Sequence, residues 1–124
     1  MNSPISNELC WSDPFNPAQT GPYPSSSQGL GPNGVKPSYR GVGYIYGYSA
    51  FRAWAEANGI TKMFRAHEVV QPDGVRMDFS ADMPAGGPEH YTVFSSGNYM
   101  GMPNKGGCVI LTEGLTNVRK IILE

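Results

Sequence analysis

The chain of 124 residues is poor in charge, in cysteine and in histidine. Charged residues make up 15% of it and the formal net charge is −1, so it has no electrostatic footprint for nucleic acid or an anionic membrane. No apolar run approaches the roughly 20 residues of a membrane span. The opening MNSPISNELC lacks the charged and apolar regions of a signal peptide. We therefore expect a cytoplasmic or nuclear protein with neither a nucleic-acid nor a membrane partner.

The two cysteines, Cys10 and Cys108, are far apart in the sequence and have no CxxC spacing. This predicts free thiols in a reducing compartment, and nothing in the pattern indicates a disulfide.

Only two histidines are present, and one of them, His67, lies in the stretch MFRAHEVV. A zincin motif HExxH is excluded, because the third residue after Glu68 is Gln71. One histidine alone cannot build a metal site, which needs about three or four ligands. Taken by itself, His67 is better explained as a buried histidine bonded to a backbone carbonyl.

Glycine and proline are abundant, with 16 and 11 residues respectively, which indicates many turns and few long helices. The stretch 14–39 is dominated by Pro, Gly, Ser and Asn and is predicted to be a loop or surface insertion. With 40% hydrophobic residues, the rest of the chain can support the core of one domain.

One helix is predicted, in SAFRAWAEANG. Ser49 is the candidate N-cap, and Phe51, Trp54 and Ala55 share one face by their spacing. Gly59 is the expected stop just past the last turn. The other predicted elements are strands at 41–48, 60–66, 91–96, 107–112 and 118–124, a hairpin-like turn at 72–74, and a loop at 82–90.

Arg40 and Tyr99 are further candidates for chemistry. An arginine beside glycines can bring its planar fork to a phosphate, although position alone favours an ordinary surface arginine. A tyrosine in a Gly-Asn turn can position a substrate oxygen, or can be a half-buried turn residue. The stretch RGVGYIYG partly fits an RNA-binding RNP1 pattern, but Val42 and Gly47 occupy positions that need aromatic residues, so this alternative ranks far lower.

The order of the motifs carries more information than any single one. LCWSDP, YRGVGYIYG, MFRAHEVVQPDG, YTVFSSGNYMG and NKGG follow one another along the chain. They resemble the C-terminal part of the phosphoprotein phosphatase family, the metal-dependent serine/threonine phosphatases that include calcineurin. The family stretches read LLWSDP, N-x-RG-x-x-Y-x-FG, I-x-RAHE/Q-x-V-x-DG, T-x-FSAPNY and N-x-GA. The resemblance covers residues 1–124 apart from insertions at about 15–38 and 81–90.

The resemblance implies an α/β fold. The chain would be the C-terminal portion of a two-layer metallophosphoesterase β-sandwich, mostly strands with one main helix. It would be incomplete without an N-terminal half.

The resemblance also implies roles for individual residues. His67 matches a ligand of one of two catalytic divalent metal ions, for which Mn, Fe or Zn is suited to an imidazole nitrogen. Arg40 matches the arginine that binds the substrate phosphate, and Tyr99 a tyrosine that lines the active site. Trp11 and Asp13 match WSDP, with Trp11 near the substrate and Asp13 supporting the catalytic centre. The implied reaction is in-line attack of a metal-bridging hydroxide on phosphoserine or phosphothreonine.

Several departures accompany the resemblance. Gly97 stands where the family has Pro, Met100 where Cys is common, and Lys62 where an aliphatic residue lines a docking groove. The family motifs GDxHG, GDxxDRG, GNHE and HGG are absent, so only one metal ligand is expected here. We therefore expect the chain alone to be inactive and to need an N-terminal half or a partner chain to act on a phosphoprotein. The alternative is a non-catalytic, pseudophosphatase-like subunit or scaffold.

Overall fold

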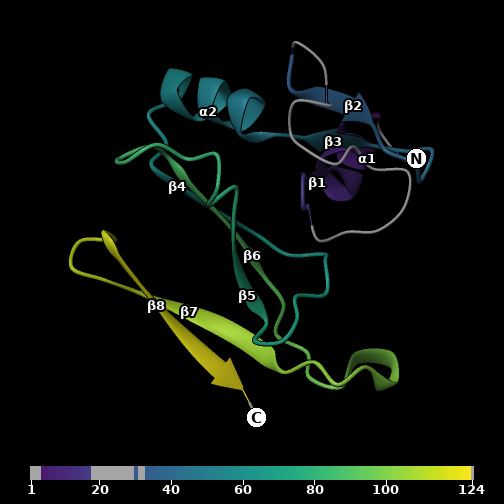
Figure 1. Cartoon of the computed structure of the whole chain (residues 1–124), viewed down its shortest axis with the longest axis vertical. Coiled ribbons are helices and arrows are strands. Elements are labelled where there is room, and N and C mark those ends of the chain that lie inside the picture. The colour runs from purple at the N-terminus through teal and green to yellow at the C-terminus, as the bar shows by residue number, and fades with distance from the viewer. Residues whose placement is uncertain (1–3, 18–29, 31–32, 124) are drawn as a thin grey trace. The chain divides into compact units, whose positions relative to one another are not determined.

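The computed structural model describes residues 4–17, 30 and 33–123. The chain divides into two compact units, Met1–Thr61 with Asp78–Glu89, and Lys62–Met77 with His90–Glu124. Within the described ranges there are three small sheets and two α-helices (Figure 1). The predicted α/β class, mostly strands with one main helix, is confirmed. None of the described helices has the length and apolar character needed to cross a membrane.

The first unit is built on a sheet of three short strands with the order β1-β3-β2. β1 pairs with β3 in parallel, with Asp13 opposite Ile45, and β2 pairs with β3 in antiparallel fashion, with Val35 opposite Tyr46. The elements in chain order are α1 (Pro4–Trp11), β1 (Asp13–Pro14), β2 (Val35–Pro37), β3 (Tyr44–Tyr46) and α2 (Tyr48–Ala57).

The predicted loop 14–39 is wrong at Val35–Pro37, which form β2. Pro37 fits there because β2 is an edge strand, where a residue without an N–H is tolerated. Most of the predicted insertion, residues 18–29 and 31–32, lies outside the described residues. The predicted strand 41–48 is confirmed only at 44–46, since Gly41 and Gly43 have φ of +76° and +72°, which no extended strand allows.

The predicted helix is confirmed as α2, but it begins earlier than expected. Its N-cap is Gly47, so the assignment of Ser49 as N-cap is wrong. The stop is as predicted, because Gly59 follows the C-cap and has a φ of +66°. The buried face contains Phe51 and Ala55, whereas Trp54 is 48% exposed.

The helix α1 is an element that the sequence analysis did not predict. Its proline lies at the first position, where a missing N–H costs nothing. Ile5 and Leu9 are 69% and 80% exposed, so the helix lacks the buried apolar face by which a helix is usually recognised.

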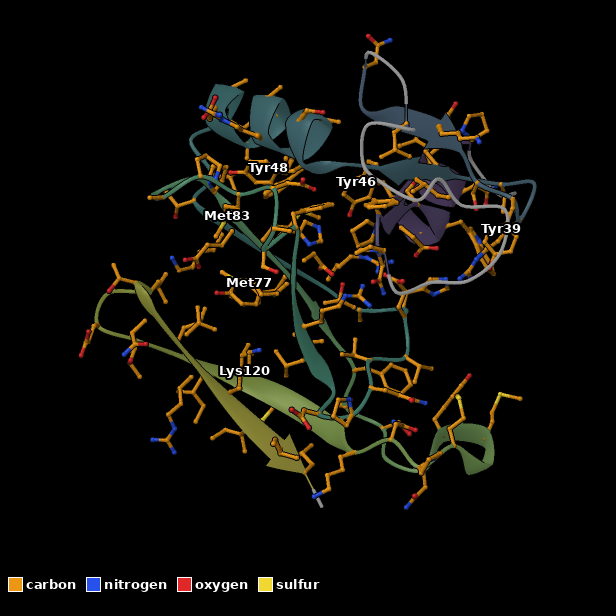
Figure 2. The ribbon with its side chains drawn as sticks, in the orientation of Figure 1. Tyr39, Tyr46, Tyr48, Met77, Met83 and Lys120 are labelled. Carbon is orange, nitrogen blue, oxygen red and sulfur yellow. The ribbon has the colours of Figure 1, made fainter. Side chains whose placement is uncertain are left out.

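An aromatic cluster forms the core of the first unit around Phe79, which directly follows the strand β5 (Val75–Asp78). Phe79 stacks on Phe51 with ring centroids 6.1 Å apart. Its ring centroid lies 6.1 Å from that of Tyr46 and 6.0 Å from that of Tyr48, the two tyrosines of the cluster that are labelled in Figure 2. Its φ of +60° is unusual for a bulky residue. Packing therefore holds Phe79 in a conformation that its backbone alone disfavours.

The second unit contains a three-stranded sheet and a hairpin. The sheet has the order β4-β6-β5, and its apolar side includes Phe64, stacked on Tyr91 at 5.0 Å. The hairpin strands pair in antiparallel fashion from Gly106 opposite Leu123 to Thr112 opposite Asn117. The elements are β4 (Lys62–Arg65), β5 (Val75–Asp78), β6 (Glu89–Val93), η2 (Tyr99–Gly101), β7 (Gly106–Thr112) and β8 (Asn117–Leu123), with the end residues Asp78 and Glu89 assigned to the first unit.

Most of the strands predicted here are confirmed within one or two residues at their ends, except that β6 begins at Glu89 and ends at Val93 rather than spanning 91–96. The turn at 72–74 is confirmed, but it does not join a hairpin. β6 lies between β4 and β5 in the sheet, so the strands on either side of the turn are not neighbours.

Candidate functional site

In the first unit the structure brings Asp13 and Arg40 together. Asp13 Oδ2 lies 3.4 Å from Arg40 Nη2, and the carboxylate is fully buried while the guanidinium side chain is 29% exposed. The guanidinium carbon of Arg40 also lies 5.9 Å from the ring centroid of Tyr39, which is labelled in Figure 2, within reach of a cation–π contact. The buried carboxylate therefore orients a guanidinium that still reaches solvent.

The backbone explains why these two motifs meet. The parallel ladder of β1 and β3 is extended by Phe15 N–H donating to the Tyr46 carbonyl at 2.8 Å. On the other side, Tyr44 N–H donates to Ser12 Oγ at 3.0 Å. A Cβ on Gly43 would lie 2.5 Å from the Trp11 carbonyl oxygen, so only glycine allows this approach. Trp11 itself ends α1 and is 39% exposed.

In the second unit His67 lies just after β4, on an exposed turn. The expectation of a buried histidine is therefore wrong. Its φ of +88° is a backbone conformation that L side chains rarely adopt. Residues held in this way cluster at functional sites, where surrounding structure maintains the strain.

Glu68, the next residue, is buried and bonded to two arginines. Its Oε2 accepts from Arg65 Nη1 and, at 3.2 Å, from Arg76 Nη2. Arg76 also donates to Thr92 Oγ1 at 3.4 Å. The network thus links the His67 turn to β5 and β6.

Tyr99 lies on a loop whose path is set by Asn104. The Asn104 Oδ1 accepts from Tyr99 N–H at 3.0 Å, and its Nδ2 donates to the Ser96 carbonyl at 2.7 Å. Asn104 is 2% exposed. The Tyr99 ring is 40% exposed and packs edge-on against Phe94 at 5.2 Å. Its phenol is carried on a well-anchored loop.

Glycines allow the Tyr99 loop and the turn after His67 to lie close together. Phe94 N–H donates to the Gly74 carbonyl at 2.7 Å, and Gly107 N–H donates to the Phe94 carbonyl at 2.9 Å. A Cβ on Gly74 would lie 2.2 Å from Gly107 N, and one on Gly107 would lie 2.5 Å from the Asp73 carbonyl oxygen. These contacts explain the glycines of QPDG and NKGG.

The five predicted site residues therefore fall into two groups, Asp13, Arg40 and Trp11 in the first unit and His67 and Tyr99 in the second. An exposed imidazole has the donor chemistry to ligate Mn, Fe or Zn. The described part of the chain contains no group of three or more His, Cys, Asp or Glu side chains that could hold a metal ion. His67 fits as one ligand, and the described residues do not make up a complete set.

Sequence reasoning missed Glu68 and Asn104. The arginine three residues before Glu68 was the available signal, because residues at this spacing can pair across a turn. Asn104 opens the NKGG motif, but no local pattern indicates its hydrogen bonds to the backbone at Ser96 and Tyr99.

Comparison with known proteins finds a similarity to a serine/threonine protein phosphatase. The chain is 30% identical over 118 residues to serine/threonine-protein phosphatase 2B catalytic subunit A1 of Saccharomyces cerevisiae. The match covers 91% of this chain and 20% of that protein, so the chain spans about one fifth of the length of this relative. No protein-family model matches the chain.

Proposed function

We propose that the chain is the C-terminal part of a metal-dependent protein serine/threonine phosphatase that hydrolyses phosphoserine or phosphothreonine. The observation that carries this proposal is the 30% identity to a phosphatase catalytic subunit along 91% of the chain. The ion pair of Asp13 with Arg40 and the strained, exposed His67 support it, since both belong to the motifs that carry the resemblance.

Arg40 would bind the phosphoryl group of the substrate. A guanidinium offers a planar fork of N–H donors, so one edge can hold a carboxylate while another holds phosphate oxygens. Asp13 would fix the plane of this fork, because a buried carboxylate leaves its ion-pair partner few orientations. The positive charge would neutralise the transferring group as its charge develops.

His67 would donate an imidazole nitrogen to one of two divalent metal ions, and Tyr99 would hydrogen-bond a substrate oxygen through its phenol. When bound, the metal ions would activate the attacking water and stabilise the phosphoryl oxygens. The remaining ligands would come from another segment of a longer polypeptide or from a partner chain. The substrate would be a phosphoprotein of the cytoplasm or nucleus.

Phosphatase assays test the proposal most directly. The chain is assayed with Mn²⁺ and a phosphoserine peptide, alone and together with a polypeptide carrying GDxHG, GDxxDRG and GNHE. We expect hydrolysis only in the combined sample. Arg40→Ala should lower kcat/KM by at least about a hundredfold, as loss of a transition-state donor does.

His67→Ala should remove one equivalent of bound metal and abolish activity. The matched control is Arg52→Ala, which removes an exposed arginine of the first unit and should leave both readouts unchanged. Full activity of Arg40→Ala and His67→Ala would overturn the assigned roles. A folded, stoichiometric complex without activity would instead favour a non-catalytic subunit.

A further inference from the structure

Glu68 is the centre of a buried ion network that brackets His67. One of its oxygens, Oε2, contacts the guanidinium groups of both Arg65 and Arg76. The side chains of Glu68, Arg65 and Arg76 are 4%, 10% and 22% exposed. Charges buried to this degree are costly to separate, so the network is a stiff part of the second unit.

The positions of these residues along the chain matter as much as their burial. Arg65 ends β4 and Glu68 lies three residues later, so their ion pair closes a small ring of chain that contains His67. Arg76 on β5 ties the same carboxylate across the sheet and also contacts Thr92 on β6. The turn is therefore fixed to all three strands of the sheet.

His67, which lies within this ring, has a backbone conformation that is unfavourable for a residue with a side chain. The φ of His67 is +88°, and such a conformation persists only where neighbouring structure over-determines it. The ion pair of Arg65 with Glu68 joins the chain on the two sides of His67 and so can restrain its backbone.

We propose that the network of Arg65, Glu68 and Arg76 positions His67, by holding its backbone in the left-handed region so that the imidazole is aimed at a metal ion. Glu68 is the positioning residue. The part that concerns the metal rests on the proposed function, whereas the part that concerns the backbone does not.

Nuclear magnetic resonance of the labelled full chain tests the backbone part. A positive φ brings the amide and α protons of one residue close together, so His67 should give a strong intraresidue NOE between them. Glu68→Gln keeps the shape and removes the charge, and the NOE should weaken at least about twofold as φ redistributes to the allowed negative region. Glu56→Gln, which disrupts the exposed pair with Arg52, is the control and should change nothing at His67.

A double-mutant cycle separates positioning from ordinary stabilisation. Glycine adopts a positive φ without strain, so His67→Gly removes the need for the restraint. In the native chain, relaxation of His67 to a negative φ offsets part of the lost ion-pair energy, whereas a glycine at this position has no strain to release. Glu68→Gln should therefore lower the denaturant midpoint more in the His67→Gly background than in the native chain. Equal shifts in both backgrounds, together with an unchanged NOE, would overturn the proposal. If Glu68→Gln does not fold in either background, Arg76→Lys replaces it in the same cycle.

These readouts need neither metal nor activity, so they separate this inference from the proposed function. An active complex in which Glu68→Gln leaves the NOE and kcat unchanged contradicts the inference alone. If positioning matters for catalysis, Glu68→Gln should lower kcat about tenfold or more, with KM unchanged.

Discussion

The two units of the molecule each contain an arginine–glutamate pair, and the two pairs differ in almost everything except residue type. Arg52 and Glu56 lie one turn apart on α2, with side chains 48% and 54% exposed. The side chains of Arg65 and Glu68 are 10% and 4% exposed, and the carboxylate of Glu68 also contacts Arg76. Because water screens the first pair, we expect its loss to have little effect on stability, whereas loss of the second pair should be destabilising.

The units also differ in what holds them together. The first unit contains a cluster of aromatic rings around Phe79, whereas the second contains the ion network centred on Glu68. A substitution should therefore act first on the unit whose kind of contact it removes. The following substitutions test this difference, from the largest expected effect to the smallest.

Phe51→Ala should lower the free energy of unfolding of the first unit by about 3–5 kcal/mol, because it removes a buried ring that stacks on Phe79. Trp54→Ala, on the exposed side of the same helix, is the control and should cost much less. Amide hydrogen exchange measures the protection of backbone amides in each unit separately. Equal loss of protection in both units would contradict the contrast drawn here.

Glu68→Gln should destabilise the second unit by about 3 kcal/mol, because it leaves two partly buried arginines without their carboxylate. Glu56→Gln makes the same chemical change on the surface of α2 and should have no measurable effect. Urea denaturation of the two variants measures the difference. Matching midpoints would show that burial does not distinguish the pairs.

Gly43→Ala should be more costly than Gly41→Ala by about 1–3 kcal/mol. Both glycines have a positive φ, so both substitutions carry the same backbone penalty. Only the Cβ at Gly43 would meet the Trp11 carbonyl, since nothing lies within 4 Å of the Cβ position at Gly41. The difference in melting temperature between the two variants therefore measures the close approach of Gly43 to the Trp11 backbone, which helps to bring Asp13 beside Arg40.

Tyr48→Phe should have the smallest effect, a gain of about 1 kcal/mol in stability near neutral pH. The Tyr48 hydroxyl is buried and has no hydrogen-bond partner among the described groups, so its removal relieves a desolvation cost. Burial raises the pKa of Tyr48 above 10.0, outweighing the lowering by Arg52.

The raised pKa gives a second readout for the same variant. Above pH 10.0 the unfolded chain loses the phenol proton before the folded chain does, so native stability falls as pH rises. Tyr48→Phe should show a weaker fall in this range. Parallel pH profiles for the two proteins would count against the burial of this hydroxyl.

Sequence patterns within one segment predicted those helices and strands that depend on that segment alone. The helix at α2 followed from the spacing of Phe51 and Ala55 and from Gly59, and the hairpin strands followed from runs of β-formers. The helix α1 was missed because it buries no apolar face, and β2 because Val35 lies in a stretch dominated by loop residues.

The sequence predicted which residues belong to the candidate site, but not how they contact one another. Arg40 and His67 stand out by residue type and order, but the sequence does not say that Asp13 lies against Arg40 or that His67 has a positive φ. Those facts depend on a parallel strand pairing and on an ion network between different strands. Both are non-local, so no pattern within one segment encodes them.

The contacts of Asn104 have a consequence for how the Tyr99 loop can vary. Its side chain forms hydrogen bonds with backbone atoms of Ser96, Tyr99 and Lys105. None of these three bonds involves a side chain of the loop. The path of the loop is therefore set by main-chain hydrogen bonds, so we expect the side chains at Tyr99 and Met100 to tolerate exchange, with β-branched residues disfavoured at Met100 because its φ is +51°. A library randomised at these two positions would present different side chains to solvent on a loop whose backbone path is kept by Asn104.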